Sequence, residues 1–212
     1  MIRRQVDPVS PDPDALAEAA RVIAAGGIVA LPTDTLYGLA ADPFRPEAVA
    51  RVLAAKGRSA ERALPLIAAD VEQIARTLGP LPASAQPLTR AFWPGPLTLL
   101  LEACSTLADG VTGATGRVGV RVPDHAVARA LCQMCERPLT ATSANVSGEP
   151  PADDPNEVER TIGTRIDLLL DAGRTRGGPP STIVDVTGRL PRLVRPGAVS
   201  WDAVLLACAQ RG

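Results

Sequence analysis

Short apolar blocks alternate with polar ones along the chain, and their spacing changes between the helical and the extended period. Apolar residues three and four apart, often behind an aspartate or proline, predict helices at 12–25, 46–55, 71–78, 124–135 and 200–210. Short apolar runs bounded by glycine or proline predict strands at 28–31, 64–68, 97–101, 118–122, 138–142, 166–170, 182–186 and 192–195. This alternation predicts an α/β fold with a twisted mixed β-sheet flanked by helices.

The stretch 26–42, GGIVALPTDTLYGLAAD, organises the rest of the chain. A double glycine precedes the apolar strand at 28–31, and three hydroxyl or carboxylate side chains, Thr33, Asp34 and Thr35, follow Pro32. Polar residues at a strand end are typical of a ligand pocket at a sheet edge. The same residue types also form plain turns, so the local pattern leaves both interpretations open.

Lys56 is the only lysine in the chain, because the other 21 of the 22 basic residues are arginine. It ends the helix predicted at 46–55 and is followed by Gly57 and Arg58. A cation suits a helix C-terminus, but arginine would serve there equally well. Because lysine is a compact point charge and a frequent phosphate ligand, the Lys56 and Arg58 pair indicates an anionic ligand.

Two further polar clusters follow predicted strands. Alternation in 117–122 puts Arg117 and Arg121 on one face of a strand, which is either an exposed face or an anion site. The preceding stretch, 110–119, is rich in glycine without matching a phosphate-binding motif, and we expect a mobile loop there. Ser143 and Asn145 extend from the strand at 138–142 into a loop that Gly148 closes.

Composition narrows the class of protein. The chain has 212 residues, which suits one domain, with a core at about 12–199 and a C-terminal helix at 200–210. A net charge of −1 and an aromatic content of 2% argue against a dedicated nucleic-acid binder. We find no signal peptide or membrane-spanning run, and we expect a cytoplasmic protein without a membrane partner. One histidine and a single CxxC give no metal site.

Seven blocks, taken in order, carry a resemblance to a known family. They are PTDTLYGLAAD, KGRSAERALPLI, FWPGPLTLLL, RVGVRVP, TATSANVSGEP, STIVDVTG and LVRPGAV. In order and spacing the chain resembles the YrdC/Sua5/TsaC family of L-threonylcarbamoyladenylate synthases, in the short form with a single domain. The resemblance implies a YrdC-like α/β domain with a concave cleft. Ser59 and residues 62–65 depart from many relatives, which puts the geometry of that loop in question.

The resemblance implies a reaction in which L-threonine, bicarbonate or CO2, and ATP give threonylcarbamoyl-AMP and pyrophosphate. The product would serve the threonylcarbamoyladenosine modification of tRNA, through a separate transferase complex, with at most a weak contact to tRNA. Two anions must meet in this reaction, so cations and neutral donors are the side chains it needs. Mg²⁺ is expected with ATP, as in other phosphoryl transfers, although the sequence offers no cluster of ligands for it.

By the family's pattern, Lys56, Arg58, Ser143 and Asn145 form its signature and are expected at the nucleotide and carbamate. The resemblance also implies two binding sets. We expect ATP to be bound by Lys56, Arg58, Arg117, Ser143, Asn145 and Arg195. We expect threonine to be bound by Thr33, Arg121, Ser181 and, through its backbone, Ala141.

Two rival functions remain open at this point. The first is a carbamoyladenylate-forming enzyme like the corresponding domain of the hydrogenase-maturation protein HypF, although that protein also has an acylphosphatase domain and zinc-finger cysteines that this sequence lacks. The second is a non-catalytic, RNA-binding YrdC-like module. The low aromatic content weakens this second alternative, because single-strand binding relies on aromatic stacking.

Overall fold

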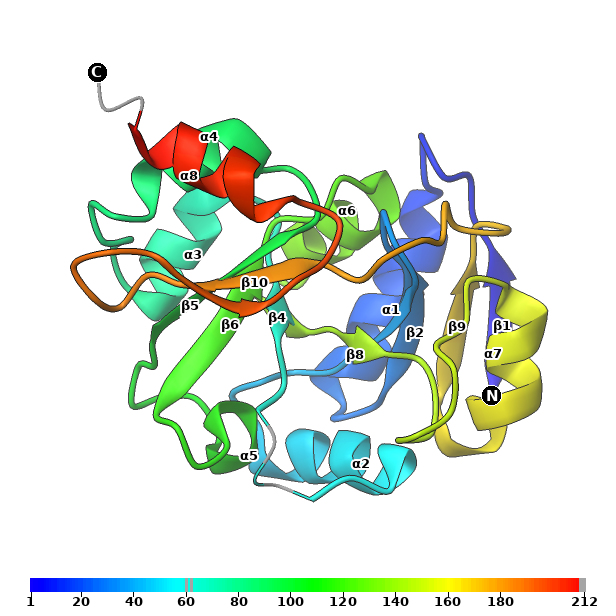
Figure 1. Cartoon of the computed structure of the whole chain (residues 1–212). Coiled ribbons are helices and arrows are strands. Elements are labelled where there is room, and N and C mark those ends of the chain that lie inside the picture. The colour runs from blue at the N-terminus through cyan, green and yellow to red at the C-terminus, as the bar shows by residue number, and fades with distance from the viewer. Residues whose placement is uncertain (60, 62, 210–212) are drawn as a thin grey trace.

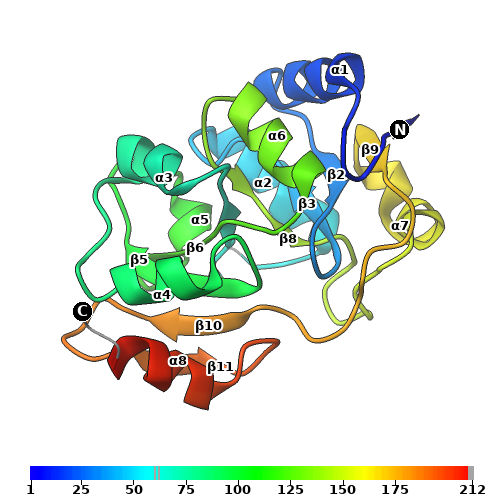
Figure 2. The same cartoon turned by 90° about the horizontal axis from the view of Figure 1, so that it is seen from above.

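Two β-sheets meet in the middle of the molecule and helices pack around them (Figures 1 and 2). The computed structural model describes residues 1–59, 61 and 63–209. The first sheet has the order β1 (Ile2–Gln5), β9 (Leu168–Asp171), β2 (Val29–Pro32), β3 (Tyr37–Ala40) and β8 (Thr142–Ser143). The second has the order β11 (Arg192–Arg195), β10 (Thr182–Asp185), β5 (Leu97–Glu102), β6 (Arg117–Arg121), β4 (Leu66–Ile67) and β7 (Leu139–Thr140).

Both sheets are mixed, which confirms the predicted α/β class. In the first, β2 runs parallel to β9 and antiparallel to β3. In the second, β5 runs parallel to β10 and antiparallel to β6. The expectation of one sheet is wrong, because strand pairing divides the strands into two sets. In Figure 1, β10, β5 and β6 lie on one side, β2, β9 and β1 on the other, and β8 between them.

The helices include the five predicted ones, each within two residues of its predicted bounds. They are α1 (Pro13–Ala24), α2 (Pro46–Lys56), α3 (Val71–Leu78), α4 (Gln86–Phe92), α5 (Asp109–Thr112), α6 (Ala126–Met134), α7 (Pro155–Ile162), the 3₁₀ turn η1 (Gly163–Arg165) and α8 (Trp201–Ala209). Side chains of Asp12, Asp70 and Asp154 accept hydrogen bonds from backbone N–H groups in the first turns of α1, α3 and α7. Residue 210, in the predicted C-terminal helix, lies outside the described residues.

Strand β2 shows how the core is divided. Its side chains alternate between the two faces of the sheet, as the extended backbone requires. Val29 and Leu31 join a cluster with Ile23 of α1 and Leu131 of α6, whereas Ala30 joins a second cluster that includes α2. The whole strand is buried, because helices cover it on both faces.

The chain passes from one sheet to the other at Ala141. We expected one strand at 138–142, but β7 pairs with β4 of the second sheet and β8 pairs with β3 of the first. Between them, the Ala141 N–H donates to the carbonyl of Pro65 at 2.8 Å. A single short stretch therefore belongs to both sheets, and it lies where they meet.

Three other features differ from what the sequence led us to expect. The stretch 110–119 is not simply a loop, because α5 occupies its first residues and β6 its last. Strands β1 and β3 were not anticipated, since β1 precedes the expected core and β3 was interpreted as part of a polar turn.

Within the part of the chain that the structure describes, no helix is both long enough and apolar enough to span a bilayer.

Candidate active site

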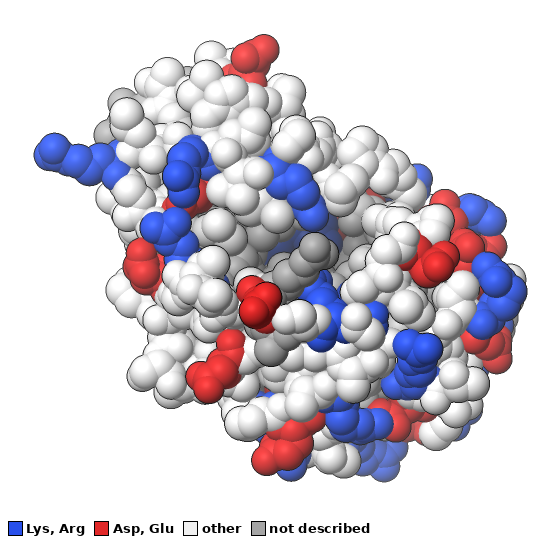
Figure 3. Space-filling view, turned by 60° about the horizontal axis from the view of Figure 1, so that its bottom comes forward, with Lys and Arg blue, Asp and Glu red and all other residues white. Residues whose placement is uncertain are grey.

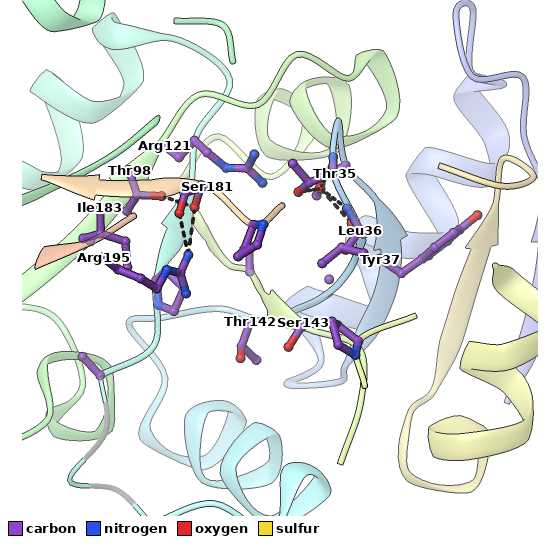
Figure 4. Close-up of a pocket in the computed structure, with 18 of the residues that line it drawn as sticks. Thr35, Leu36, Tyr37, Thr98, Arg121, Thr142, Ser143, Ser181, Ile183 and Arg195 are labelled. Atoms are coloured by element: carbon purple, nitrogen blue, oxygen red, sulfur yellow. Dashed lines mark hydrogen bonds between the residues drawn. The ribbon is translucent and has the colours of Figure 1, made fainter. Parts of the chain in front are cut away.

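A cavity of about 400 Å³ opens where the two sheets meet. In the space-filling view, basic side chains lie inside and around a hollow near the middle of the face (Figure 3). The lining residues come from both sheets and from the crossing between them (Figure 4). Those named in the predicted site are Thr33, Arg58, Arg121, Ala141, Ser143, Ser181 and Arg195. Seven of the ten predicted residues thus surround one space.

The second sheet supplies one wall through side chains of three adjacent strands. Gly119 lies opposite Leu100 in the register of β6 and β5, and Thr98 lies opposite Ile183 in that of β5 and β10. All four line the cavity. Alternation in β6 directs Val118 and Val120 into the core, so the other face of the strand is left for the cavity.

Arg121 lies in this wall and is almost completely buried. Its Nη1 donates to Asp34 Oδ1 at 2.7 Å, and the side chains of the two residues are 9% and 4% exposed. Burial lowers the pKa of Arg121, and Asp34 opposes that effect. The second oxygen, Asp34 Oδ2, is buried without a hydrogen-bond partner among the described residues. Leaving such an oxygen unpaired costs about 1–3 kcal/mol, so the carboxylate is not there for stability alone.

A chain of hydroxyl and guanidinium groups continues along the same wall (Figure 4). Thr98 Oγ1 and Ser181 Oγ are 2.8 Å apart, and Arg195 Nη2 donates to the Ser181 carbonyl at 2.7 Å. Burial lowers the pKa of Arg195, and the positive charge of Arg121 lowers it further. The positive charges of the two guanidinium groups therefore repel each other, and an anion bound between them would relieve that repulsion.

Arg58 reaches the cavity from the segment after α2. Its Nη2 donates to the carbonyl of Ala63 at 3.1 Å, and its Nη1 to Thr142 Oγ1 at 3.4 Å. Gly57, with φ of 59°, ends α2 in the left-handed conformation and turns the chain toward this position. Thr142 and Ser143, on β8, line the cavity beside it.

Lys56 does not line the cavity but lies beneath the loop that does. Its Nζ donates to the carbonyls of Ser143 at 2.5 Å and Asn145 at 2.8 Å, and to Asn145 Oδ1 at 3.1 Å. Burial, followed by the charge of Arg58, lowers the pKa of Lys56 to about 8. Ser143 Oγ also donates to Asn145 Oδ1 at 2.5 Å. Lys56 and Asn145 thus hold Ser143 in position, and their direct contact with a ligand stays a prediction.

Arg117 also lies outside the cavity lining. It shares the cavity-facing side of β6 by alternation, as predicted, but its Nη1 donates to Asp185 Oδ2 at 2.8 Å. Arg192 donates to the same oxygen at 3.0 Å. These ion pairs satisfy the charge of Arg117 without a ligand. A contact between Arg117 and ATP stays a prediction.

Several lining residues were missed in the sequence. Thr35 belongs to the polar cluster after β2, so the sequence offered a signal for it, as it did for Asp34 behind Arg121. Thr98, Leu100 and Ile183 gave no such signal, because their places depend on which strands pair. Tyr37 points away from the cavity in Figure 4, and its hydroxyl donates to the Gly173 carbonyl at 2.6 Å.

The acidic residues do not form a metal centre in the described structure. None of the described cavity-lining residues is acidic, and no group of three potential metal ligands occurs in residues 1–59, 61 and 63–209. The site offers guanidinium, hydroxyl and backbone groups, which suit an anion with carboxylate or phosphate oxygens.

Fold and site together define an α/β protein with a cavity, lined by arginine and hydroxyl side chains, at the junction of two mixed sheets. The sequence profile of the Sua5/YciO/YrdC family, described as "Telomere recombination", matches residues 21–197. The chain belongs to this family.

Named relatives agree with this assignment. The threonylcarbamoyl-AMP synthase of Pyrococcus abyssi is 39% identical over 186 residues, which are 88% of this chain and 55% of that protein. The enzyme of the same name from Marinobacter nauticus is 40% identical over 185 residues, 86% of this chain and 97% of that protein. This chain therefore spans little more than half of the archaeal relative and nearly all of the bacterial one.

Solved structures give the same picture. The crystal structure of P. abyssi Sua5 complexed with L-threonine superposes with a TM-score of 0.92 and 36% identity, covering 98% of this chain and 61% of that one. Escherichia coli YciO, at 22% identity and a TM-score of 0.86, covers 96% of this chain and shares the fold.

Proposed function

We propose that this protein is an L-threonylcarbamoyladenylate synthase, a nucleotidyltransferase that makes threonylcarbamoyl-AMP and pyrophosphate from L-threonine, bicarbonate or CO2, and ATP. One observation carries the proposal. Arg58, Arg121 and Arg195 surround a single cavity in a fold that matches a Sua5 structure complexed with L-threonine at a TM-score of 0.92. Relatives of the same name that are 39% and 40% identical to this chain support it.

The chemistry needs groups of this kind. The threonine amine attacks the carbon of CO2 and loses a proton, which gives a carbamate. A carbamate oxygen then forms a bond to the α-phosphorus of ATP, while the bond from that phosphorus to the bridging oxygen breaks and pyrophosphate leaves. Both partners are anions, so the protein must mainly align them and offset their charge. No side chain need act as the nucleophile.

We assign the residues to the two substrates as the family resemblance implies. Arg121, Ser181, Thr33 and the backbone of Ala141 are proposed to bind threonine. Arg58, Ser143 and Arg195 are proposed to bind the nucleotide. Lys56 and Asn145 would act on the nucleotide chiefly by holding Ser143, because their polar atoms bond to that loop.

Mg²⁺ is proposed to enter as part of the ATP substrate. The absence of acidic residues from the described cavity lining means that these side chains do not form a resident site, whereas phosphate oxygens would supply ligands of their own. The protein's part is then to hold the phosphates through guanidinium and hydroxyl groups.

We further propose that the product passes to a separate threonylcarbamoyl transferase complex that modifies tRNA, in the cytoplasm. A net charge of −1 supports at most a weak contact with tRNA itself.

The test is pyrophosphate release by the purified protein, with ATP and Mg²⁺ and with threonine and bicarbonate each present or absent. Release that needs both would support the synthase, and L-serine in place of threonine measures its selectivity. Release with carbamoyl phosphate alone would instead favour a carbamoyladenylate-forming enzyme. HypF shares the fold at 22% identity, which does not by itself favour that chemistry.

If no condition gives release, the catalytic proposal fails. Gel-shift binding to tRNA that is tight, salt-sensitive and independent of ATP would then favour the RNA-binding module.

A further inference from the structure

Thr98 places a buried hydroxyl group in the otherwise apolar middle of strand β5. The strand directs Leu97 and Leu99 into the core, so alternation leaves Thr98 on the side of the cavity, which it lines. Only 3% of the residue is exposed, and its hydroxyl is 2.8 Å from Ser181 Oγ, its one hydrogen-bond partner among the described residues. A valine would fill the same space without needing a partner, so the hydroxyl of Thr98 calls for an explanation.

The Thr98 and Ser181 hydroxyls together carry one proton more than their mutual bond uses. Two bonded hydroxyl groups hold two protons, and only one of these lies between the oxygens. The other has no acceptor among the described residues. Arg195 Nη2 is 3.4 Å from Ser181 Oγ, but a guanidinium group only donates. Because both hydroxyl residues line the cavity, the spare O–H is available to a ligand there.

The surroundings of the pair favour Ser181 as the residue that offers this proton. Thr98 is the more deeply buried of the two, and Ser181 is half-buried. In Figure 4, Arg121 and Arg195 lie on either side of Ser181, and the charge of Arg121 lowers the pKa of Arg195.

An anionic oxygen at Ser181 therefore fits one order of the two protons. In that order Thr98 donates to Ser181 Oγ, and the Ser181 O–H donates to the anion, beside the two guanidinium groups. The reverse order would turn lone pairs of Ser181 Oγ toward the anion and repel it. The partner that sets the order is the hydroxyl of Thr98.

We propose that Thr98 is a positioning residue for the amino-acid substrate: its hydroxyl donates to Ser181 Oγ and thereby directs the Ser181 O–H at a carboxylate oxygen of that substrate. Thr98 itself need not touch the substrate. The inference rests on the proposed function, since it takes the ligand at Ser181 to be threonine. The two residues meet because β5 and β10 are parallel neighbours, with Leu97 opposite Thr182.

The test is a double-mutant cycle in the full chain, with Thr98→Val, Ser181→Ala and the two combined. Calorimetric titration measures the Kd of L-threonine for each protein. We expect Thr98→Val to weaken binding about fivefold and Ser181→Ala about tenfold, because a hydrogen bond to a charged group is misdirected or lost. The double variant should bind no more weakly than Ser181→Ala, since Thr98 acts through Ser181.

A structural role for Thr98 would give a different result. Weakening of the double variant by a further factor of about five, or unchanged binding in Thr98→Val, overturns the proposal. Thr98→Ser keeps the hydroxyl and should restore binding to within about twofold of the unaltered protein. If Thr98→Ser binds as weakly as Thr98→Val, packing matters and the proposal falls.

Thr187→Val is the matched control. It removes a hydroxyl that donates to Asp185 Oδ1 at 2.7 Å, outside the cavity lining, and it should leave the Kd of threonine unchanged. If Thr98→Val does not fold, Thr98→Ala takes its place in the cycle with the same expected pattern.

A failure of the proposed function is distinguishable from a failure of this inference. If the unaltered protein binds no threonine, that function falls, and crystal structures of the unaltered protein and of Thr98→Val judge the positioning of Ser181. Without its partner, Ser181 Oγ should turn to a new rotamer in the variant. A Ser181 Oγ that keeps its position overturns the inference in that case as well.

Discussion

Lys56 shows why one position in an arginine-rich chain is a lysine. Its ammonium group is 2.5–3.1 Å from three oxygens of one loop, and only 2% of the residue is exposed. A compact ammonium can direct three donors to three converging acceptors, whereas a planar fork cannot. The sequence indicated that this lysine is special. The structure shows its bonds to a loop, and its contact with a ligand stays a prediction.

Burial of Lys56 predicts a pH-dependent stability. The pKa of Lys56 falls from 10.5 in the unfolded chain to about 8 in the folded protein, so unfolding takes up a proton between these values. The contribution of Lys56 to the free energy of unfolding should therefore rise with pH from about 8 to 10.5. Urea unfolding at about pH 7 and pH 9.5 measures it, with Lys56→Met as the reference. A difference between the two proteins that does not grow with pH would contradict the pKa shift.

Gly119 provides space, not a special backbone conformation. It lies in the cavity wall, its φ is not positive, and a Cβ there would meet Thr98 Cγ2 at 3.1 Å and Leu100 Cδ2 at 3.4 Å. We predict that Gly119→Ala narrows the cavity and raises the KM for threonine about tenfold, while the melting temperature changes little. Steady-state kinetics and thermal melts check this, with Gly188→Ala as a control. Unchanged kinetics would mean that no substrate reaches this wall.

Hydrogen bonds join the turn between β11 and α8 to Thr182, the first residue of β10, which directly follows Ser181. We call this contact the clamp. The Thr182 hydroxyl donates to the Val199 carbonyl at 2.6 Å and accepts from the Val199 N–H at 3.0 Å. Gly197 crosses this point so closely that a Cβ would lie 2.6 Å from the Ser181 carbonyl carbon. Figure 2 shows β10, β11 and α8 together at one edge of the molecule. The clamp thus ties a C-terminal element to the cavity.

Thr182→Val should break the clamp without changing its shape. The N–H and carbonyl of the half-buried Val199 lose their partner, so we expect a loss of about 0.5–1.5 kcal/mol in the free energy of unfolding. Because Ser181 and Arg195 flank the clamp, kcat/KM should fall as well. Denaturant unfolding and pyrophosphate-release kinetics measure the two effects. Thr187→Val, at a hydroxyl that bonds to Asp185 away from the cavity, is the comparison, and it should leave kcat/KM unchanged.

Elements with local signals were predictable, and those that depend on distant pairing were not. The caps of α3 and α7 follow from Asp70 and Asp154, because a capping side chain bonds within its own turn. The division into two sheets and the crossing at Ala141 depend on pairing between β7 and β4 and between β8 and β3. No short-range pattern in 138–143 records which strands these residues will meet.

The candidate site was predictable to the extent that its residues are chemically conspicuous. Arg58, Arg121 and Ser143 stood out as cations or hydroxyls at strand or helix ends, and the family resemblance added Ser181 and Arg195. All five line the cavity. Arg117 stood out equally, but Asp185, which is distant in sequence, pairs with it. Apolar wall residues such as Leu100 look like any core residue. Charge and position therefore identify candidates, and only the tertiary fold shows which of them have partners already.

Because the cavity lies between the two sheets, its ligands should stabilise the whole molecule. A ligand that binds only the folded state at about 100 times its Kd raises the free energy of unfolding by about 2.7 kcal/mol. For a chain of this size that corresponds to roughly 5–10 °C in melting temperature. We expect threonine and ATP each to give a shift of this order in thermal melts, and Asp42→Asn, which alters an ion pair outside the cavity lining, to leave the shifts intact. Saturating ligand that binds by calorimetry without raising the melting temperature would mean that it binds the unfolded chain as well as the folded one.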